Sequence, residues 1–272
     1  MEREKIEERN SEIIKMSFTK SQKEIAEFFN LSQGVVSSIL RKNGIKLPKS
    51  RLNMSRLELD IDYFKYIDSP RKAYWLGLIC ADGTINKNGS KLGIMVKDKE
   101  ICEKIKKDIK SGHKISHVNS LDKRTNKEYS EYCIQITNAI FVSHIVNLGI
   151  NNDKSNTLLF PNIEEEFYPY FIAGLFDGDG CICTKHTGYS FCSLISTKEV
   201  LNFIQEILLD KFGIQPKKLL RVSDKCKNVF KISWQNKKDC LLLLNYIYQG
   251  DKEMYLQRKY EKYKILLNGN LL

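Results

Sequence analysis

Two aspartates, Asp82 and Asp179, each end an apolar stretch and are each followed by glycine. Each stretch predicts a helix that ends at Asp-Gly, so the carboxylate faces the negative end of the helix dipole, which costs about 0.3–1 kcal/mol unless a cation offsets it. Two such carboxylates at one seam of a basic protein favour a site for Mg²⁺ ions, which activate water and stabilise a leaving phosphate oxygen. The alternative is a pair of Asp-Gly turns that only end core helices.

Glycines in the same two stretches indicate how the carboxylates meet. Gly77 and Gly174 each lie five residues before the aspartate of their stretch. Glycine inside a helix is about 1 kcal/mol less favourable than alanine, but it lets two helices pack backbone to backbone. We therefore expect the two helices to pair about a pseudo-twofold axis that brings Asp82 and Asp179 side by side.

The two stretches belong to a longer internal repeat. Tyr74–Ile85 aligns with Phe171–Ile182, and three further landmarks recur in the same order at offsets of 96 to 99 residues: Lys97–Ile101 with Ser196–Val200, Gln135–Thr137 with Lys231–Ser233, and Asn151–Leu158 with Gln249–Leu256. Because the offset is nearly constant, we infer that a unit of roughly a hundred residues has been duplicated and fused.

Each copy of the unit predicts the same order of elements. A helix ends at Asp-Gly and is followed by two strands, a second helix, two more strands and a third helix, which is the order αββαββα. The predicted ranges are strands 84–85, 92–96, 114–120 and 130–137 with helices 99–110 and 138–148 in the first copy, and strands 181–184, 191–195, 217–223 and 228–234 with helices 198–211 and 236–248 in the second. The predicted fold class is therefore α+β with a duplicated unit.

The first 48 residues predict a small all-α domain. Ser21 and Glu24 have the spacing of a capping box, and Ser32 suits the N-cap of the next helix. The expected apolar stripes are Ile25, Phe28 and Phe29 on one helix and Val35, Val36, Ile39 and Leu40 on the next, which Asn43-Gly44 is expected to close in the left-handed conformation. Two short helices joined by a tight turn, with a third before them, are typical of a helix-turn-helix.

Basic and polar residues around the second of these helices favour DNA as its partner. From Leu31 to Leu57 there are six basic residues and no acidic residue. Glutamine and serine read base edges, and arginine and lysine hold phosphates, so the expected DNA contacts are Gln33, Ser37, Ser38, Arg41 and Lys42 on the helix and Lys46, Lys49 and Arg51 on an extended arm. A helical bundle without a ligand is the alternative.

The predicted domains are a helix-turn-helix over 1–48, a basic linker over 49–69, and two repeats over 70–160 and 161–268.

Trp75–Gly83 and Ile172–Gly180 resemble the two signature copies of the LAGLIDADG homing endonucleases, in their two-motif, single-chain form. The resemblance covers about residues 62–268. It implies two curved antiparallel sheets that form a pseudo-twofold saddle over DNA, with the signature helices paired at the centre. Cys80 stands where the signature has aspartate, whereas the second copy keeps Asp177.

The resemblance also implies the residues of an active site. It implies that two or three Mg²⁺ or Mn²⁺ ions are held by the carboxylates of Asp82 and Asp179 and by the main-chain oxygens of Ala81 and Gly178. It further implies a lysine in each half near the cleaved phosphates, and the repeat alignment matches Lys154 with Lys252. Such lysines stabilise charge that develops on phosphate, although two solvated surface lysines are the alternative. Asp98 and Thr197 fall near outer positions of the implied site and are equally typical of helix N-caps.

The strands of each sheet predict a DNA-reading surface. Alternate strand residues point to opposite faces, so Ile134, Ile136, Phe230 and Ile232 are expected to face the helices and their neighbours to face away. The expected DNA contacts on the strands are Asn86, His117, Gln135, Lys185, Arg221 and Lys231, since a two-stranded ribbon fits the major groove. The two halves differ at these positions, so the target is expected to be long and asymmetric.

Composition bounds the class of protein. The chain has 272 residues, 44 Lys+Arg against 33 Asp+Glu, and a formal charge of +11, which favours nucleic acid as partner. No apolar run reaches the ~20 residues that a membrane span requires, and the polar N-terminus does not resemble a signal peptide. The eight cysteines form no CxxC pair, so buried thiols in a reducing compartment are expected and not a zinc site. These features predict an intracellular protein, and the resemblance implies that its setting is a bacterium, a phage-infected cell or an organelle.

These observations together predict a monomeric, Mg²⁺-dependent double-strand DNA endonuclease with an N-terminal helix-turn-helix. Hydrolysis of the phosphodiester is expected to proceed by in-line attack of water, one strand per half-site. Two rivals stay open on the same fold: a catalytically silent DNA-binding regulator, and an RNA maturase that helps an intron fold. A transcription factor led by the N-terminal domain is disfavoured by the duplicated Asp-Gly helices.

Overall fold

A computed structural model describes residues 2–17, 20–43, 57–122, 126–184, 190–222 and 227–268. The chain divides into two compact units, the smaller consisting mainly of Met1–Leu57 and the larger of most of Glu58–Leu272. The domain boundaries that we predict from the sequence are finer than this division and remain predictions. Among the described helices, none is long and apolar enough to cross a membrane.

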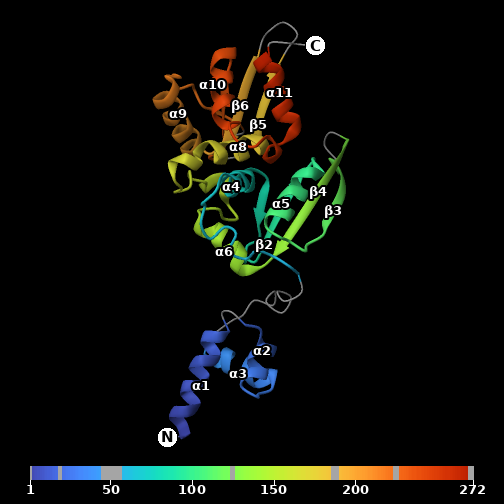
Figure 1. Cartoon of the computed structure of the whole chain (residues 1–272), viewed down its shortest axis with the longest axis vertical. Coiled ribbons are helices and arrows are strands. Elements are labelled where there is room, and N and C mark those ends of the chain that lie inside the picture. Colours follow the sequence, from blue (N-terminus) through green and yellow to red (C-terminus); the bar gives the residue numbers. More distant parts are fainter. Residues whose placement is uncertain are drawn as a thin grey trace. The chain divides into compact units, whose positions relative to one another are not determined.

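The smaller unit contains three helices, α1 (Glu2–Met16), α2 (Gln22–Phe28) and α3 (Gln33–Lys42) (Figure 1). The capping box is present, because the Glu24 amide donates to Ser21 Oγ at 3.2 Å and the Ser21 amide donates to Glu24 Oε2 at 2.7 Å. Ser32 Oγ accepts from the Val35 amide at 3.3 Å and so caps α3. The core of this unit is formed by Ile13, Ile25, Ala26, Val36 and Leu40.

Three details of the smaller unit differ from expectation. Phe28 and Val35 are 63% and 41% exposed and do not belong to the core. The buried stripe of α2 is centred between Ile25 and Ala26, and Phe28 falls beside it at 100° per residue. Asn43 is not left-handed: its φ is −92°, and its side-chain amide instead donates to Ile39 O at 2.8 Å, which satisfies a carbonyl at the helix end.

The larger unit contains the predicted repeat, and the α+β fold with its αββαββα order is confirmed. The first copy consists of α4 (Pro70–Asp82), β1 (Gly83–Ile85), β2 (Lys91–Val96), α5 (Lys99–Asp108), β3 (Ile115–Asp122), β4 (Lys127–Thr137) and α6 (Ala139–Asn147). The second consists of α8 (Tyr168–Asp179), β5 (Gly180–Thr184), β6 (Ser190–Ser196), α9 (Lys198–Phe212), β7 (Leu220–Arg221), β8 (Phe230–Trp234) and α10 (Lys237–Ile247). Short helices lie between and after the copies: α7 (Lys154–Thr157), η2 (Glu165–Phe167) and η3 (Lys252–Met254), followed by α11 (Gln257–Asn268).

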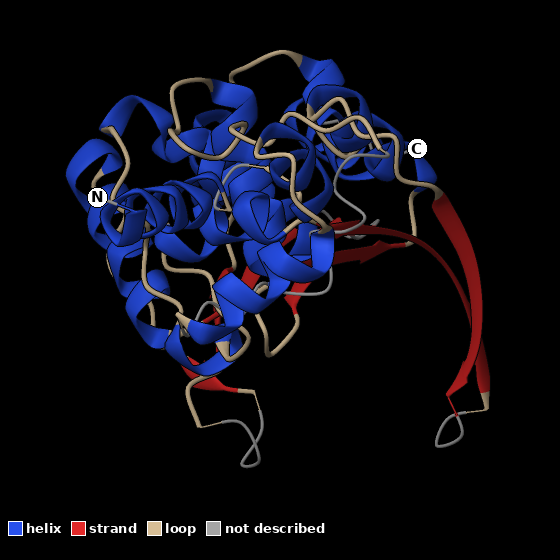
Figure 2. Ribbon diagram, turned by 90° about the horizontal axis from the view of Figure 1, so that it is seen from below, coloured by secondary structure: helices blue, strands red, loops and turns tan. Residues whose placement is uncertain are grey.

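Each copy forms one four-stranded antiparallel sheet, in the orders β1-β2-β4-β3 and β5-β6-β8-β7. The expected alternation holds, since Ile134, Ile136 and Ile232 are fully buried against the helices. Strands β3 and β4 extend as a curved two-stranded ribbon (Figure 2). Strand β7 is shorter than predicted, because the Lys217 amide donates to the Gln205 side chain of α9 and not to β8.

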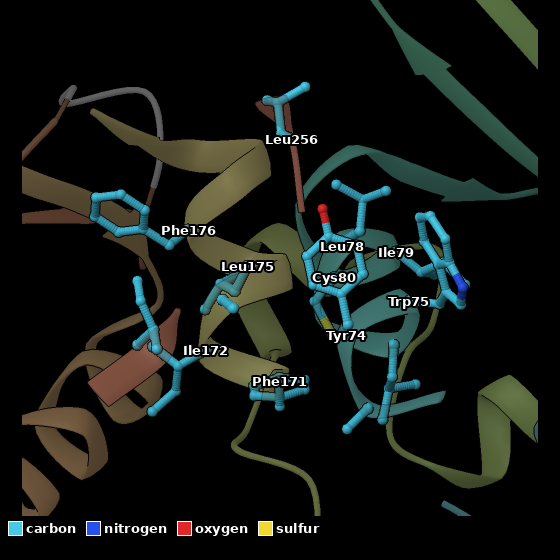
Figure 3. Packing of buried hydrophobic residues seen from close by; sticks show 14 of the residues in the cluster. Tyr74, Trp75, Leu78, Ile79, Cys80, Phe171, Ile172, Leu175, Phe176 and Leu256 are labelled. Atoms are coloured by element: carbon cyan, nitrogen blue, oxygen red, sulfur yellow. The ribbon is translucent and has the colours of Figure 1, made fainter. Parts of the chain in front are cut away.

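Helices α4 and α8 pack against each other from Tyr74 to Asp82 and from Phe171 to Gly178, and the two glycines lie at their closest approach. A Cβ on Gly77 would collide with Phe171 O and lie 2.8 Å from the Leu175 nitrogen. A Cβ on Gly174 would likewise collide with Tyr74 O and lie 2.8 Å from the Leu78 nitrogen of α4. Side chains such as Leu78 and Leu175 fill the space around the crossing (Figure 3). The expected backbone-to-backbone pairing about a pseudo-twofold axis is therefore present.

Adding a methyl group at this crossing is expected to destabilise the protein severely. We predict that Gly77→Ala lowers the free energy of unfolding by about 3 kcal/mol or more, because the colliding atoms are backbone and cannot rotate away. Urea unfolding followed by circular dichroism measures the change.

Gly34→Ala is the matched control, since its added Cβ meets only Ser32 Oγ, at 3.8 Å. It also lies in a helix and should be neutral or stabilising by up to about 1 kcal/mol. Equal stability of Gly77→Ala and the parent would contradict the close approach of α4 and α8.

Candidate active site at the paired helix ends

The pairing of α4 and α8 brings their C-terminal ends to one place. Asp82 is the last residue of α4 and Asp179 the last of α8. The position that a Cβ would take on Gly178 lies 3.1 Å from Asp82 Oδ2 and against the Ala81 side chain, so the end of each helix touches the end of the other. Asp82 is half-buried, and Asp179 is exposed at the surface. The two carboxylates therefore lie close enough to interact, and Asp179 is open to solvent.

The electrostatics of this seam disfavour two free negative charges. Burial raises the pKa of Asp82 to about 6, with the charge of Asp179 as the next cause. Burial also raises the pKa of Asp179. Within the described ranges, no hydrogen bond reaches either carboxylate. The half-buried carboxylate of Asp82 thus lacks the donors that usually accompany a buried charge, and a bound cation would offset its charge.

Lys154 reaches the end of α4 from the start of α7. Its ammonium donates to Ala81 O at 2.6 Å and to Cys80 O. These carbonyls have no partner further along the helix, and a cation there is favoured by the helix dipole. Burial lowers the pKa of this lysine, and its charge in turn lowers the pKa of Asp82 and of Asp179.

Lys259 reaches the end of α8 in the same manner from α11. It is only 5% exposed, and its ammonium donates to Phe176 O and Asp177 O at 2.7 Å each and to Gly178 O at 3.4 Å. Burial lowers its pKa to about 8. The two helix ends therefore have a similar construction, with one carboxylate near one lysine in each half: half-buried Lys154 at the end of α4 and buried Lys259 at the end of α8.

The repeat alignment points to Lys252, but the structure brings Lys259 to this place. Lys252 is exposed at the first residue of η3. The difference arises because α11, which carries Lys259, has no counterpart in the first copy. A signal was present in the sequence: Lys259 shares one face of α11 with Tyr263 and Leu266, both buried, and a lysine on an apolar stripe of a helix is unusual.

The donor set at the seam fits a hard divalent cation. Two carboxylates and the main-chain oxygens of Ala81 and Gly178 are oxygen ligands of the kind that Mg²⁺ prefers. In the described part of the chain, no group of three or more His, Cys, Asp or Glu side chains could hold a metal without such carbonyls. The carbonyls already accept from lysines, so a bound ion would share the site with two ammonium groups.

Asp177, the other acidic residue of the second signature copy, is buried in the core and held there by hydrogen bonds. It is 1% exposed and accepts from Tyr74 Oη at 2.8 Å, from Tyr248 Oη at 2.6 Å and from the Leu256 amide at 2.9 Å. With three donors, this carboxylate is satisfied without metal. At the matching position of α4, Cys80 is buried and its pKa is raised by that burial to about 12, so it stays a neutral thiol.

Asp98 and Thr197, two residues with alternative roles in the sequence, differ from each other. Thr197 is an N-cap: its Oγ1 accepts from the Val200 amide at 3.4 Å and donates to Leu158 O at 2.6 Å. Asp98 stands at the N-cap position of α5 without a side-chain cap, and its carboxylate instead accepts from Arg258 Nε at 2.9 Å.

The strand residues expected to contact DNA divide into two groups. Gln135 is exposed on the face opposite to the buried Ile134 and Ile136, and Lys231 is half-buried on the corresponding face of the second sheet. The register places His117 opposite Tyr132 and Arg221 opposite Phe230, so both lie on the helix-facing side and not in those rows. The His117 ring lies 4.9 Å from that of Tyr132, and the Arg221 guanidinium lies 5.9 Å from the ring of Phe230.

The remaining expected contacts are placed as follows. Asn86 is exposed, but its Oδ1 accepts from the amides of Ser90 and Lys91 and thereby closes the β1–β2 turn. On α3, Gln33, Ser37, Arg41 and Lys42 are exposed and Ser38 is half-buried. Lys46, Lys49, Arg51 and Lys185 lie outside the described residues.

Comparison with known proteins identifies the second repeat directly. Residues 166–248 match a family model described as a LAGLIDADG-like domain. A search of curated proteins by sequence finds no match.

Similar solved structures are found, and the first of the following shares the fold. That of the homing endonuclease I-WcaI bound to its DNA recognition sequence has a TM-score of 0.53 and 17% identical residues, and the match covers 82% of this chain and 97% of that one. The LAGLIDADG homing endonuclease I-GzeII in complex with its DNA target matches with a TM-score of 0.47 and 14% identity, over 74% of this chain and 89% of that one. Full-length DUF199/WhiA from Thermatoga maritima matches with a TM-score of 0.46 and 15% identity, over 78% of this chain and 67% of that one.

The raised pKa of Asp82 predicts that this carboxylate destabilises the metal-free protein. Since its pKa in the fold, about 6, lies above the ordinary 3.8, ionisation weakens folding at every pH above about 6, and the effect disappears below about 4. In EDTA at pH 7.5, Asp82→Asn is therefore expected to raise the free energy of unfolding by about 1 kcal/mol, and to lose this advantage at pH 4. Urea unfolding at both values measures it.

Asp210→Asn serves as the control, because Asp210 is an exposed carboxylate near the end of α9. A loss of stability in Asp82→Asn at pH 7.5 would mean that the carboxylate is satisfied within the fold and needs no cation.

Proposed function

We propose that this chain, a LAGLIDADG protein by its domain over residues 166–248 and by its fold, is a site-specific double-strand DNA endonuclease that uses divalent metal. One observation carries the proposal: two carboxylates from the paired helix ends, Asp82 and Asp179, meet at an accessible seam with no hydrogen bond from the described residues to satisfy them. The fold relative I-WcaI is described as bound to its DNA recognition sequence, and this supports duplex DNA as the partner.

In the proposed reaction, Asp82 and Asp179 hold Mg²⁺ or Mn²⁺ together with the carbonyl oxygens of Ala81 and Gly178. The bound metal activates water and stabilises negative charge on phosphate oxygens. Lys154 and Lys259 place positive charge at the same seam, where they stabilise charge that develops on each cleaved phosphate. In this proposal, the role that the sequence alignment assigned to Lys252 passes to Lys259.

The proposed DNA surface is the strand face that points away from the helices. Gln135 and Lys231 occupy equivalent positions of the two repeats and have different hydrogen-bonding chemistry, so the two half-sites would be read differently. A single chain with two unlike halves needs no partner subunit to complete the seam. We therefore propose a monomer that acts on a long, asymmetric target.

The smaller unit is proposed to act as a helix-turn-helix that adds affinity. On α3, Gln33, Ser37, Arg41 and Lys42 are exposed, while the opposite side of this helix is buried in the unit's core through Val36 and Leu40. A helix fixed on one side, with polar and basic residues on the other, has the form of a recognition helix.

A DNA-binding regulator without cleavage is the second candidate. The observation that favours it is that Lys154 and Lys259 already offset the charge at both helix ends without metal. Cleavage assays separate the two candidates, since a regulator binds DNA tightly and leaves it intact with or without Mg²⁺.

Removing either carboxylate is expected to abolish double-strand cutting. We predict that Asp82→Asn and Asp179→Asn each reduce cutting of a random-site DNA library about a hundredfold or more, because each loses a metal ligand worth several kcal/mol, whereas binding to the same DNA changes by less than about threefold, since phosphate contacts dominate affinity. Deep sequencing of cut ends measures the first quantity and filter binding the second.

EDTA should abolish cutting by the parent protein, and Asp210→Asn should cut at the parent rate. Cutting that survives both Asp82→Asn and Asp179→Asn would contradict the proposed site.

The helix-turn-helix proposal predicts a change in salt dependence. Each lysine or arginine that neutralises a phosphate adds about 0.9 to the slope of log affinity against log salt concentration. We expect Arg41→Gln with Lys42→Gln to lower that slope by about 1–2, and deletion of residues 1–56 to lower it further. Lys23→Gln is the control, because Lys23 lies on α2 and pairs with Glu27. An unchanged slope in the deletion would show that the smaller unit does not touch DNA.

A further inference from the structure

Four charged side chains lie at the seam, and together they are electrically neutral. Arg258, which also acts on Asp82, is paired with Asp98. The carboxylates of Asp82 and Asp179 carry two negative charges. The ammonium groups of Lys154 and Lys259 carry two positive charges, and both of these act on both carboxylates. A metal site built from two carboxylates normally draws a divalent cation through its net charge of −2, and here that attraction is cancelled by the protein itself.

The lysines also occupy oxygen atoms next to the carboxylates. Ala81 and Gly178 immediately precede the two aspartates, and their carbonyl oxygens accept from Lys154 and Lys259 at 2.6 and 3.4 Å. A divalent ion held between the aspartates would lie close to these oxygens. It would compete with the ammonium groups for them and be repelled by the same groups.

We propose that Lys154 and Lys259 act as internal counter-cations that suppress divalent-metal binding in the DNA-free protein. The inference rests on the proposed function in one respect, which is that a divalent ion binds at Asp82 and Asp179. While no DNA is present, the lysines donate to the carbonyls at the helix ends and offset the charge of the two carboxylates. DNA phosphates offer the ammonium groups an alternative partner, so metal loads most readily when the substrate is in place.

The two lysines are expected to contribute unequally. Lys154 lies directly on Ala81 O, at 2.6 Å, whereas Lys259 bonds chiefly to Phe176 O and Asp177 O and lies 3.4 Å from Gly178 O. Lys259 is therefore held one residue further from its aspartate. Its removal should relieve the competition for metal less than removal of Lys154.

The test is the affinity of the DNA-free full-length protein for Mn²⁺, measured by titration calorimetry and by the electron paramagnetic resonance signal of free Mn²⁺. Lys154→Met is expected to lower the Kd for Mn²⁺ roughly tenfold, as the loss of a unit charge near a divalent ion implies. Lys259→Met should lower it by a smaller factor, about threefold. Lys154→Arg keeps the charge and should leave the Kd within about twofold of the parent.

Two further variants serve as a control for the change in Mn²⁺ affinity and as a test of where the extra ion binds. Lys104→Met removes another half-buried lysine whose ammonium donates to a backbone carbonyl, Tyr255 O at 3.1 Å, and should leave the Kd unchanged. Adding Asp179→Asn to Lys154→Met should remove the gain, which would place the extra ion at the seam. Thermal unfolding by circular dichroism confirms that each variant is folded, and Lys259→Met remains informative if Lys154→Met is not.

The inference is overturned if Lys154→Met and Lys259→Met, both folded, bind Mn²⁺ no more tightly than the parent. That result is separable from the proposed function, which is judged by Mg²⁺-dependent cutting in the presence of DNA. If the parent protein cuts DNA and both lysine variants bind Mn²⁺ no more tightly than it does, only the counter-cation role is contradicted. If the parent protein does not cut DNA but both lysine variants bind Mn²⁺ more tightly, only the proposed nuclease activity is contradicted.

Discussion

The contact on which the larger unit depends is the crossing of α4 and α8 at Gly77 and Gly174. No side chain separates the two backbones there, because each glycine lies against the main chain of the other helix. This proximity sets how far apart the helix ends are, since each aspartate follows its glycine by five residues, about one and a half helical turns. A crossing with larger residues would hold the helices further apart, and the carboxylates would separate with them.

The same crossing makes the seam electrostatically demanding. Two C-terminal helix ends come together, each with carbonyls that have no partner within the helix and each with a carboxylate, so negative charge of two kinds accumulates at one place. A lysine from each half, half-buried Lys154 and buried Lys259, offsets this charge. Both lysines come from segments that follow the sheet of their repeat, which explains why helices outside the αββαββα unit are part of the site.

Local and repeated features of the structure could be predicted from the sequence. The capping box at Ser21, the end of each signature helix at Asp-Gly and the inward face of Ile134 and Ile136 depend on neighbours in the chain or on simple periodicity, and all were confirmed. The glycines of the crossing were found because the repeat presents them twice. Glycine destabilises the interior of a helix, and this cost is explained only if the backbone of another helix must approach closely at that residue.

Features that depend on a single copy could not be predicted in this way. Lys259 lies on α11, which the first repeat lacks, so alignment of the repeats led to Lys252 instead. The positions of His117 and Arg221 depend on strand register, because a shift of one residue moves a side chain to the other face of a sheet. The residues between β3 and β4 and between β7 and β8 contain no Asn-Gly or Asp-Gly pair, so the sequence does not specify that register.

The departure of Cys80 from the signature has a physical explanation in the asymmetry of the crossing. Asp177 is tolerated in the core because Tyr74 and Tyr248 donate hydroxyl hydrogens to it. The residues that correspond to these tyrosines in the other half, by the offset of the repeat, are Phe171 and Ile150, which have no donor. An aspartate at position 80 would lack both hydroxyl bonds, and an unpaired buried carboxylate costs several kcal/mol.

The hydrogen-bonded group of Asp177, Tyr74 and Tyr248 and the apolar group of Cys80, Phe171 and Ile150 therefore depend on each other. A signature helix with Asp177 packs best opposite a helix that supplies Tyr74, and two copies of the second repeat would place Phe171 there instead. Two copies of the first repeat would bury the Tyr74 hydroxyl against Cys80, where only a weak acceptor is available. Each half thus pairs better with the other than with itself, and Asp82 and Asp179 remain as the acidic pair that has no hydrogen-bond partner among the described residues.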